Sequence, residues 1–206
     1  VWDVCQLLKL RNIYHQKTKQ EKDMTKFTIY NKSNAPEASK KLLEESEKTY
    51  GMVPNLHGVM AESPEILEAY KAMGNFFSKS SLTPEEINVI WLTINVENKC
   101  HYCVPAHTAI AKGMKVGDDV INALRDQKPL PNQKLEALRT FTQKLIRDRG
   151  NVNDASVQAF LDAGYTKKNV FEVILGYSQK IMSNYVNHLA DTPIDDPFKD
   201  FEWKAK

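Results

Sequence analysis

The helical spacing of apolar residues across residues 35–190 is the feature that most constrains the fold of this chain. Apolar side chains recur every three or four residues, and Gly, Pro and Asn interrupt the pattern at intervals. No segment alternates convincingly between polar and apolar residues as a half-buried strand would. The expected helices cover residues 38–50, 56–60, 64–77, 84–96, 101–113, 118–126, 135–146, 157–161 and 170–190. The sequence therefore predicts an all-α fold.

One helix start is marked with particular clarity, at Thr83-Pro84-Glu85-Glu86. Thr83 suits the N-cap, Pro84 suits the first helical position, and Glu86 can complete a capping box. The helix that follows, up to Val96, is β-branched and apolar on nearly every side. We therefore expect it to be the buried helix of the domain.

Length and composition predict a single domain at residues 24–198, with a C-terminal tail at 199–206. Residues 1–23 are expected to be an N-terminal extension or sequence upstream of a start at Met24. They carry the whole net charge of +2, so the neutral remainder argues against nucleic-acid binding. No apolar run approaches the roughly 18 residues of a membrane span. Three cysteines are too few for a secreted disulfide framework, which favours the cytoplasm.

The chemistry of the chain is expected at Cys100, Cys103 and His107, which fall at i, i+3 and i+7. Pro105 places the two cysteines on or near the first turn of a helix, where unpaired N–H groups favour a thiolate. A C-x-x-C pair next to an imidazole indicates a redox-active dithiol. We predict that Cys103 attacks a peroxide, that Cys100 resolves the sulfenic acid, and that His107 is the general base.

Two other interpretations of the pair remain open. A structural zinc site would need a fourth ligand beside Cys100, Cys103 and His107, and no second C-x-x-C or H-x3-H motif is present to supply one. Alternatively, the cysteines are inert core residues, although polar Asn98, Lys99 and His101 surround them. We expect neither a bound metal nor a cofactor.

Several motifs resemble those of the carboxymuconolactone decarboxylase family, in its AhpD-like alkylhydroperoxidase branch and the subset described as peroxidase-related. The resemblance is carried by Gly51-Met-Val-Pro-Asn-Leu, Ser63-Pro64, Leu82-Thr83-Pro84-x-Glu86 and Asn98-x-Cys100-x-Tyr102-Cys103-x-x-Ala106-His107. It implies an AhpD-like multi-helix domain with the C-x-x-C at a helix start, and trimers or hexamers. It also implies an antioxidant activity, in which hydroperoxides are reduced and a lipoyl or thioredoxin-like dithiol recycles the protein.

The sequence departs from this family at the proton relay. The alkylhydroperoxidases carry a glutamate twelve residues before the first cysteine, a position that is Asn88 here. An amide cannot take up a proton at neutral pH. The relay is then lost, reduced to His107, or served by another acid, and Glu86 and Glu97 are the candidates. We therefore predict weak peroxidase activity, with an oligomeric redox sensor or disulfide-exchange protein without efficient turnover as the alternative.

Overall fold

The computed structural model of the chain describes residues 26–205, so the expectations for residues 1–23 lie outside the described part. The prediction of an all-α fold is confirmed, and the described residues contain no strand. The helices are α2 (Glu37–Tyr50), α3 (Asn55–Met60), α4 (Pro64–Ser78), α5 (Pro84–Glu97), α6 (Cys103–Gly113), α7 (Asp118–Arg125), α8 (Gln133–Arg147), α9 (Asp154–Asp162), α10 (Lys167–Ala190) and the 3-10 helix η1 (Asp196–Phe201).

The α5 helix is the buried helix that its composition predicts. Its predicted capping box is present, with Thr83 accepting from the Glu86 N–H and the Glu86 carboxylate accepting from the Thr83 N–H. Ten of its residues are buried, from Glu86 to Val96. It packs against α6, α7, α8 and α10, which makes it the centre of the domain.

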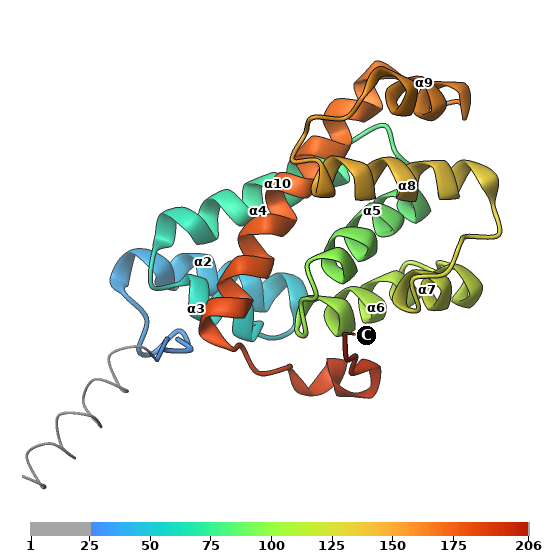
Figure 1. The fold of residues 1–206 in the computed structure, drawn as a ribbon. Coiled ribbons are helices and arrows are strands. Elements are labelled where there is room, and N and C mark those ends of the chain that lie inside the picture. Colours follow the sequence, from blue (N-terminus) through green and yellow to red (C-terminus); the bar gives the residue numbers. More distant parts are fainter. Residues whose placement is uncertain (1–25, 206) are drawn as a thin grey trace, which may run out of the picture.

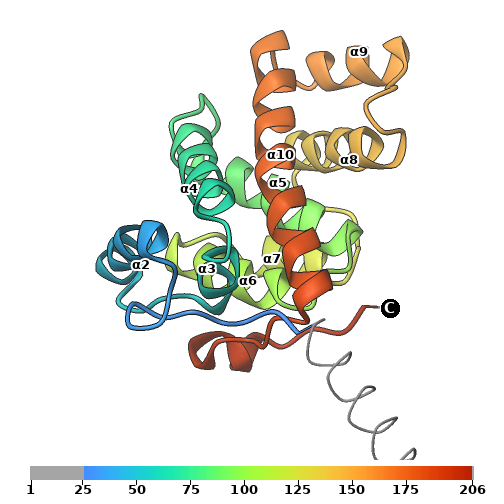
Figure 2. The same cartoon turned by 90° about the vertical axis from the view of Figure 1, so that its left-hand side faces the viewer.

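The long α10 helix joins the two halves of the molecule. It runs from α9 at one end, past α4 and α5, to α3 at the other (Figure 1). In the turned view, α2, α3 and α4 lie on one side of it and α8 and α9 on the other (Figure 2). Its start at Lys167 rather than residue 170 follows from a capping box between Thr166 and Asn169 that sequence analysis missed. The packing of α10 therefore decides what surrounds any site between the halves.

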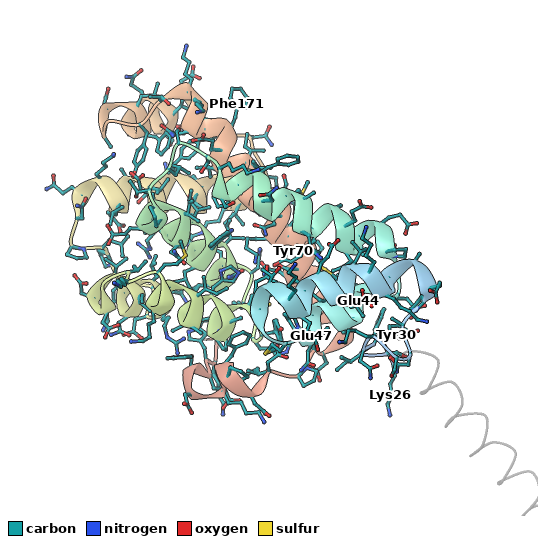
Figure 3. All side chains as sticks on the ribbon, turned by 180° about the vertical axis from the view of Figure 1, so that it is seen from behind. Lys26, Tyr30, Glu44, Glu47, Tyr70 and Phe171 are labelled. Carbon is teal, nitrogen blue, oxygen red and sulfur yellow. The ribbon has the colours of Figure 1, made fainter. Side chains whose placement is uncertain are left out.

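Several apolar residues of α10 lie outside its buried face. Ile174 and Tyr185, which mark the helix in sequence, are exposed, as are Phe171 and Leu189. Phe171 stands at the outer end of the helix, labelled in Figure 3. The buried face is instead largely polar, and it lies over the C-x-x-C segment.

The C-terminal segment folds back onto the domain. The predicted boundary at residue 198 falls within η1, which packs against α6. The Trp203 indole N–H donates to the Arg125 carbonyl at 3.0 Å. The Arg125 guanidinium donates in turn to the carbonyls of Phe201 and Glu202. The chain as far as Trp203 therefore packs on the helical body.

Candidate dithiol site

The two cysteines lie on either side of a helix start. After α5 ends, Lys99 takes the left-handed conformation with φ 53°, which turns the chain toward α6. Cys100 lies in this turn, its N–H donating to the Asn95 carbonyl at 3.0 Å. Cys103 is the first residue of α6, and its N–H donates to Cys100 Sγ at 3.2 Å. The helix thus begins two residues later than predicted, and the C-x-x-C lies at a helix start as expected.

Both thiols are free and buried beneath α10. Lys180, Ser183, Asn184 and Asn187 occupy one stripe of α10 at i, i+3, i+4 and i+7, and each is at most 1% exposed. Asn187 Nδ2 donates to Cys103 Sγ at 3.2 Å. The polar face of α10 therefore supplies the surroundings of the reactive sulfur.

A chain of amides fixes α10 over the cysteines. Asn98 Nδ2 donates to Asn184 Oδ1 at 2.8 Å, and Asn184 Nδ2 donates to Asn95 Oδ1 at 2.9 Å. Asn95 Nδ2 donates to the Cys103 carbonyl at 3.4 Å. Because buried amides are costly to leave unpaired, this network holds α5, α6 and α10 in one register.

The surroundings shift the pKa values of the two thiols in opposite directions. Burial acts to raise the pKa of Cys103, but the hydrogen bond from the Cys100 thiol and the charge of Lys180 outweigh it. With the amides of Asn187 and Asn184, they lower the pKa of Cys103 to about 6. Burial and the neighbouring sulfur raise the pKa of Cys100 instead. The surroundings therefore favour the thiolate at Cys103 and the protonated thiol at Cys100.

His107 lies in this site but bonds to a different residue than expected. Its Nε2 atom is 2.6 Å from Lys180 Nζ, whereas Nδ1 is buried without a hydrogen-bond partner among the described residues. Burial and the charge of Lys180 hold its pKa well below the ordinary value. The Trp91 ring packs against it with centroids 5.0 Å apart. No described hydrogen bond joins His107 to Cys100 or Cys103, so its role as the base of Cys103 stays a prediction.

The three candidate relay residues are bound elsewhere. Asn88 is fully buried, and its Nδ2 donates to the Pro84 carbonyl at 2.8 Å and to Met114 Sδ at 3.2 Å. Glu86 completes the cap of α5 and pairs with Lys134 at 3.1 Å. None of these contacts involves a cysteine or His107.

Glu97, at the end of α5, is bonded to α8. Arg147 donates to both of its carboxylate oxygens, at 2.8 and 2.9 Å, and Gln143 Nε2 donates to Oε1 at 2.9 Å. The proximity of Glu97 to the cysteines in sequence therefore does not become a contact in the described structure.

The residues between the cysteines anchor the C-terminal segment. The Tyr102 hydroxyl donates to the Asp195 carboxylate, which also accepts from the Asn55 N–H at 3.0 Å. His101 Nε2 lies 3.0 Å from the Thr192 carbonyl. The segment that follows α10 therefore lies against the C-x-x-C turn.

Within residues 26–205, no three His, Cys, Asp or Glu side chains gather as metal ligands would. None of the helices in that range has both the length and the apolarity to cross a bilayer.

Lys180 is the site residue that sequence analysis missed. It sits in the middle of a helix identified by its apolar residues, where a lysine is ordinarily taken as solvent-exposed. A signal was nevertheless present, because Lys180, Asn184 and Asn187 share a helical stripe with Gly176 and Val173. A polar stripe that continues such small and apolar residues can be a buried face.

Comparisons with known proteins agree with this architecture. The model of the carboxymuconolactone decarboxylase family matches residues 64–140, which run from α4 into α8. No curated protein matches the chain in sequence. Among solved structures, a peroxidase-related protein with an alkylhydroperoxidase AhpD core from Ralstonia eutropha JMP134 is similar. It has a TM-score of 0.75 and 21% identity, over 84% of this chain and 93% of that chain.

Two further structures show the same fold. A peroxidase-related protein from Silicibacter sp. TM1040 has a TM-score of 0.69 and 22% identity, over 80% of this chain and 88% of that one. The debrominase Bmp8, as a Cys-to-Ala variant with 2,3,4-tribromopyrrole, has a TM-score of 0.70 and 16% identity, over 84% and 93%. The resemblance predicted from the motifs is thus confirmed: residues 64–140 match the model of the carboxymuconolactone decarboxylase family, and the chain has an AhpD-like fold.

Proposed function

We propose that this protein is a thiol-dependent peroxidase that reduces hydroperoxides through a Cys100/Cys103 dithiol–disulfide cycle. The observation that supports this proposal most directly is the contact of two free thiols in one buried site at a helix start, where the Cys103 N–H donates to Cys100 Sγ at 3.2 Å and Asn187 Nδ2 donates to Cys103 Sγ at 3.2 Å. These surroundings lower the pKa of Cys103 to about 6 and raise that of Cys100. A nucleophilic thiolate and a protonated resolving thiol need pKa values shifted in these two directions.

The cycle has three steps. The Cys103 thiolate attacks one peroxide oxygen, the O–O bond breaks, and an alkoxide leaves with the electron pair and takes up a proton. The Cys100 thiol then attacks the Cys103 sulfenic acid, which forms the disulfide and releases water. An external dithiol, lipoyl or thioredoxin-like, reduces the disulfide and is itself oxidised. His107 takes part in the proton transfers, and the proposed cycle uses neither Glu86 nor Glu97.

We further propose that the protein works in the cytoplasm as a homo-oligomer, a trimer or hexamer. The stripe of exposed apolar residues on α10 supports an interface between copies, because Phe171 and Leu189 are 71% and 73% exposed. A dithiol that must be recycled suits a reducing compartment.

The test measures peroxide consumption by the purified protein with a lipoyl or thioredoxin-type reductant. The parent protein should turn over, Cys103→Ser should be inactive, and Cys100→Ser should stop after one equivalent with a sulfenic acid on Cys103. Mass spectrometry with a sulfenic-acid trap identifies the modified residue. A sulfenic acid on Cys100 in the Cys103→Ser protein, with none on Cys103 in the other variant, would reverse the assignment.

The second candidate function is a redox sensor or disulfide-exchange protein without efficient turnover. Asn88, which has no proton to give or accept at neutral pH, supports it, as does the burial of both sulfurs. Stoichiometric disulfide formation without turnover under every reductant would favour this candidate over the peroxidase.

A further inference from the structure

Lys180 is a buried amine on α10. Its side chain is 1% exposed, at the centre of α10. Its Nζ atom lies 2.6 Å from His107 Nε2 and 3.3 Å from the Tyr70 hydroxyl, and 5.5 Å from the centroid of the Tyr70 ring. Within residues 26–205, no carboxylate forms an ion pair with it. A buried ammonium needs a compensating charge, because its desolvation is otherwise very costly.

The anion available to Lys180 is the Cys103 thiolate. On the same stripe of α10, Ser183 Oγ and Asn187 Nδ2 lie 4.0 and 3.2 Å from Cys103 Sγ, so Lys180 lies one turn of helix from a residue that contacts this sulfur. Its positive charge lowers the pKa of Cys103 and also the pKa values of His107 and His57. The titratable groups that face it are therefore Tyr70 from α4, His107 from α6, Cys103 at the start of α6 and, further off, His57 from α3. Of these, only Cys103 is an anion at neutral pH. Figure 3 marks Tyr70 where α4 passes α10.

The contact between Lys180 and His107 is also a path for a proton. An ammonium at 2.6 Å donates to Nε2, which assigns the imidazole hydrogen to Nδ1. Nδ1 is buried and unpaired among the described residues. Asn187 Oδ1 is likewise buried and unpaired there, while the amide nitrogen of the same residue donates to Cys103 Sγ. The site therefore keeps an N–H and an acceptor oxygen that no described residue satisfies.

We propose that Lys180 has two roles. It is the counter-ion of the Cys103 thiolate, and it supplies the proton that the leaving alkoxide receives through His107. The first role concerns the resting protein alone, and the second role rests on the proposed peroxidase function. Lys180 acts through His107 and is therefore a positioning residue. In this proposal Lys180, and not residue 88, supplies the proton.

The proton balance follows directly. Cys103 as thiolate, Cys100 as thiol, Lys180 as ammonium and one hydroperoxide give a disulfide, an alcohol, water and Lys180 as neutral amine. The O–O bond is reduced, the two sulfurs are oxidised, and the alkoxide receives the proton of Lys180. Oxidation removes the anion and the cation together, so the buried site is neutral in both states. At a pH above the Cys103 transition, disulfide formation then takes no proton from the solvent.

The first test follows the thiolate by its absorbance near 240 nm as a function of pH, in a Cys5→Ser background so that only the two site thiols remain. Removing a neighbouring opposite charge shifts a pKa by about 1–3 units. Lys180→Met should therefore lower the thiolate fraction at pH 6 by about fivefold or more. Lys180→Arg should keep the thiolate fraction of the parent protein. Lys71 pairs with Glu45 on the surface, so Lys71→Met should leave the thiolate fraction unchanged. An unchanged transition in Lys180→Met would overturn the counter-ion assignment.

The second test counts protons during stoichiometric oxidation at pH 7.5 in weak buffer with a pH indicator. The parent protein should take up nearly no proton per disulfide. Lys180→Arg should take up about one, because a guanidinium keeps its charge. One proton per disulfide in the parent would overturn the proton-source assignment, and this holds even if Lys180→Met does not fold.

Hydrogen peroxide and diamide serve as parallel oxidants, and both oxidise the same pair of thiols with the same proton balance. Oxidation by diamide alone would refute the proposed peroxidase function. In that case the thiolate titration and the proton count would still test the role of Lys180. Cys103→Ser, which cannot form the disulfide, provides the baseline.

Discussion

The buried imidazole of His57 predicts a loss of stability in mild acid. His57 lies on α3 and donates from Nδ1 to Ser46 Oγ at 2.9 Å, since that hydroxyl itself donates to the Leu42 carbonyl. Burial, with the charges of Lys71 and Lys180, lowers its pKa from 6.5 to about 3. The folded protein thus keeps this histidine neutral in a range where the unfolded chain protonates it.

Proton linkage gives the sign and the size of this loss of stability. For a lowered pKa, the contribution to stability is fully present above the unfolded value of 6.5 and is lost as the pH falls toward 3. Between pH 7.5 and pH 5, the unfolded state gains about one proton at this site. The free energy of unfolding then falls by about 2 kcal/mol. Few carboxylates titrate above pH 5, but Cys103, with a pKa of about 6, titrates in this window as well. The contribution of His57 is therefore measured as the difference between the parent and a His57 variant.

The assay is urea unfolding at pH 7.5 and pH 5 for the parent, His57→Phe and Ser46→Ala. Phe keeps a ring between Tyr50 and Tyr70, which both meet the imidazole edge-to-face, but it cannot titrate. His57→Phe should lose about 2 kcal/mol less than the parent across the window. Ser46→Ala removes the hydrogen bond and keeps the imidazole, so its acid loss should match that of the parent. A His57→Phe protein with the full acid loss would refute the reasoning.

Three further predictions concern the C-terminal segment, the relay and the surface of α10. Asp195→Ala should lower the free energy of unfolding in urea by about 1–3 kcal/mol, because the Tyr102 hydroxyl and the Asn55 N–H lose their acceptor. Asp200→Ala, at an exposed position, should change it little. Glu97→Gln should cost less than about 1 kcal/mol and leave the initial rate of peroxide reduction unchanged. A loss of rate would instead make Glu97 the relay acid. Leu189→Asp should shift the mass measured by light scattering toward the monomer, and an unchanged oligomer would place the interface elsewhere.

Local signals explain why the helices could be predicted from sequence. The capping box at Thr83 and the glycine after Tyr50 act over three or four residues, and they mark helix ends in the structure as expected. The start of α6 at Cys103 rather than residue 101 depends on one left-handed residue, Lys99, that few sequence patterns would indicate. Short-range chemistry therefore predicts elements well and their ends less well.

The site could be predicted only in part, because half of it comes from a helix far away in the chain. Cys100, Cys103 and His107 are close in sequence, so their proximity follows from helical geometry alone. Lys180 and Asn187 reach them only through the packing of α10, which turns its polar stripe inward. Apolar periodicity predicts the opposite orientation for a monomer. The two observations agree if the outward apolar stripe is itself covered by another copy.

The amide at Asn88, in place of a relay acid, is consistent with the buried cation at Lys180. A carboxylate at that position would have to approach His107, but Asn88 bonds to the first turn of its own helix and to Met114. Being an amide, it leaves His107 and Lys180 as the ionisable groups that bond to one another beside the thiols. A site with one thiolate and one ammonium is neutral overall, whereas an added carboxylate would favour a protonated Cys103. Lys180 therefore stabilises the Cys103 thiolate, which an acid at residue 88 would destabilise. The variant Asn88→Glu should accordingly raise the pH at which the thiolate forms.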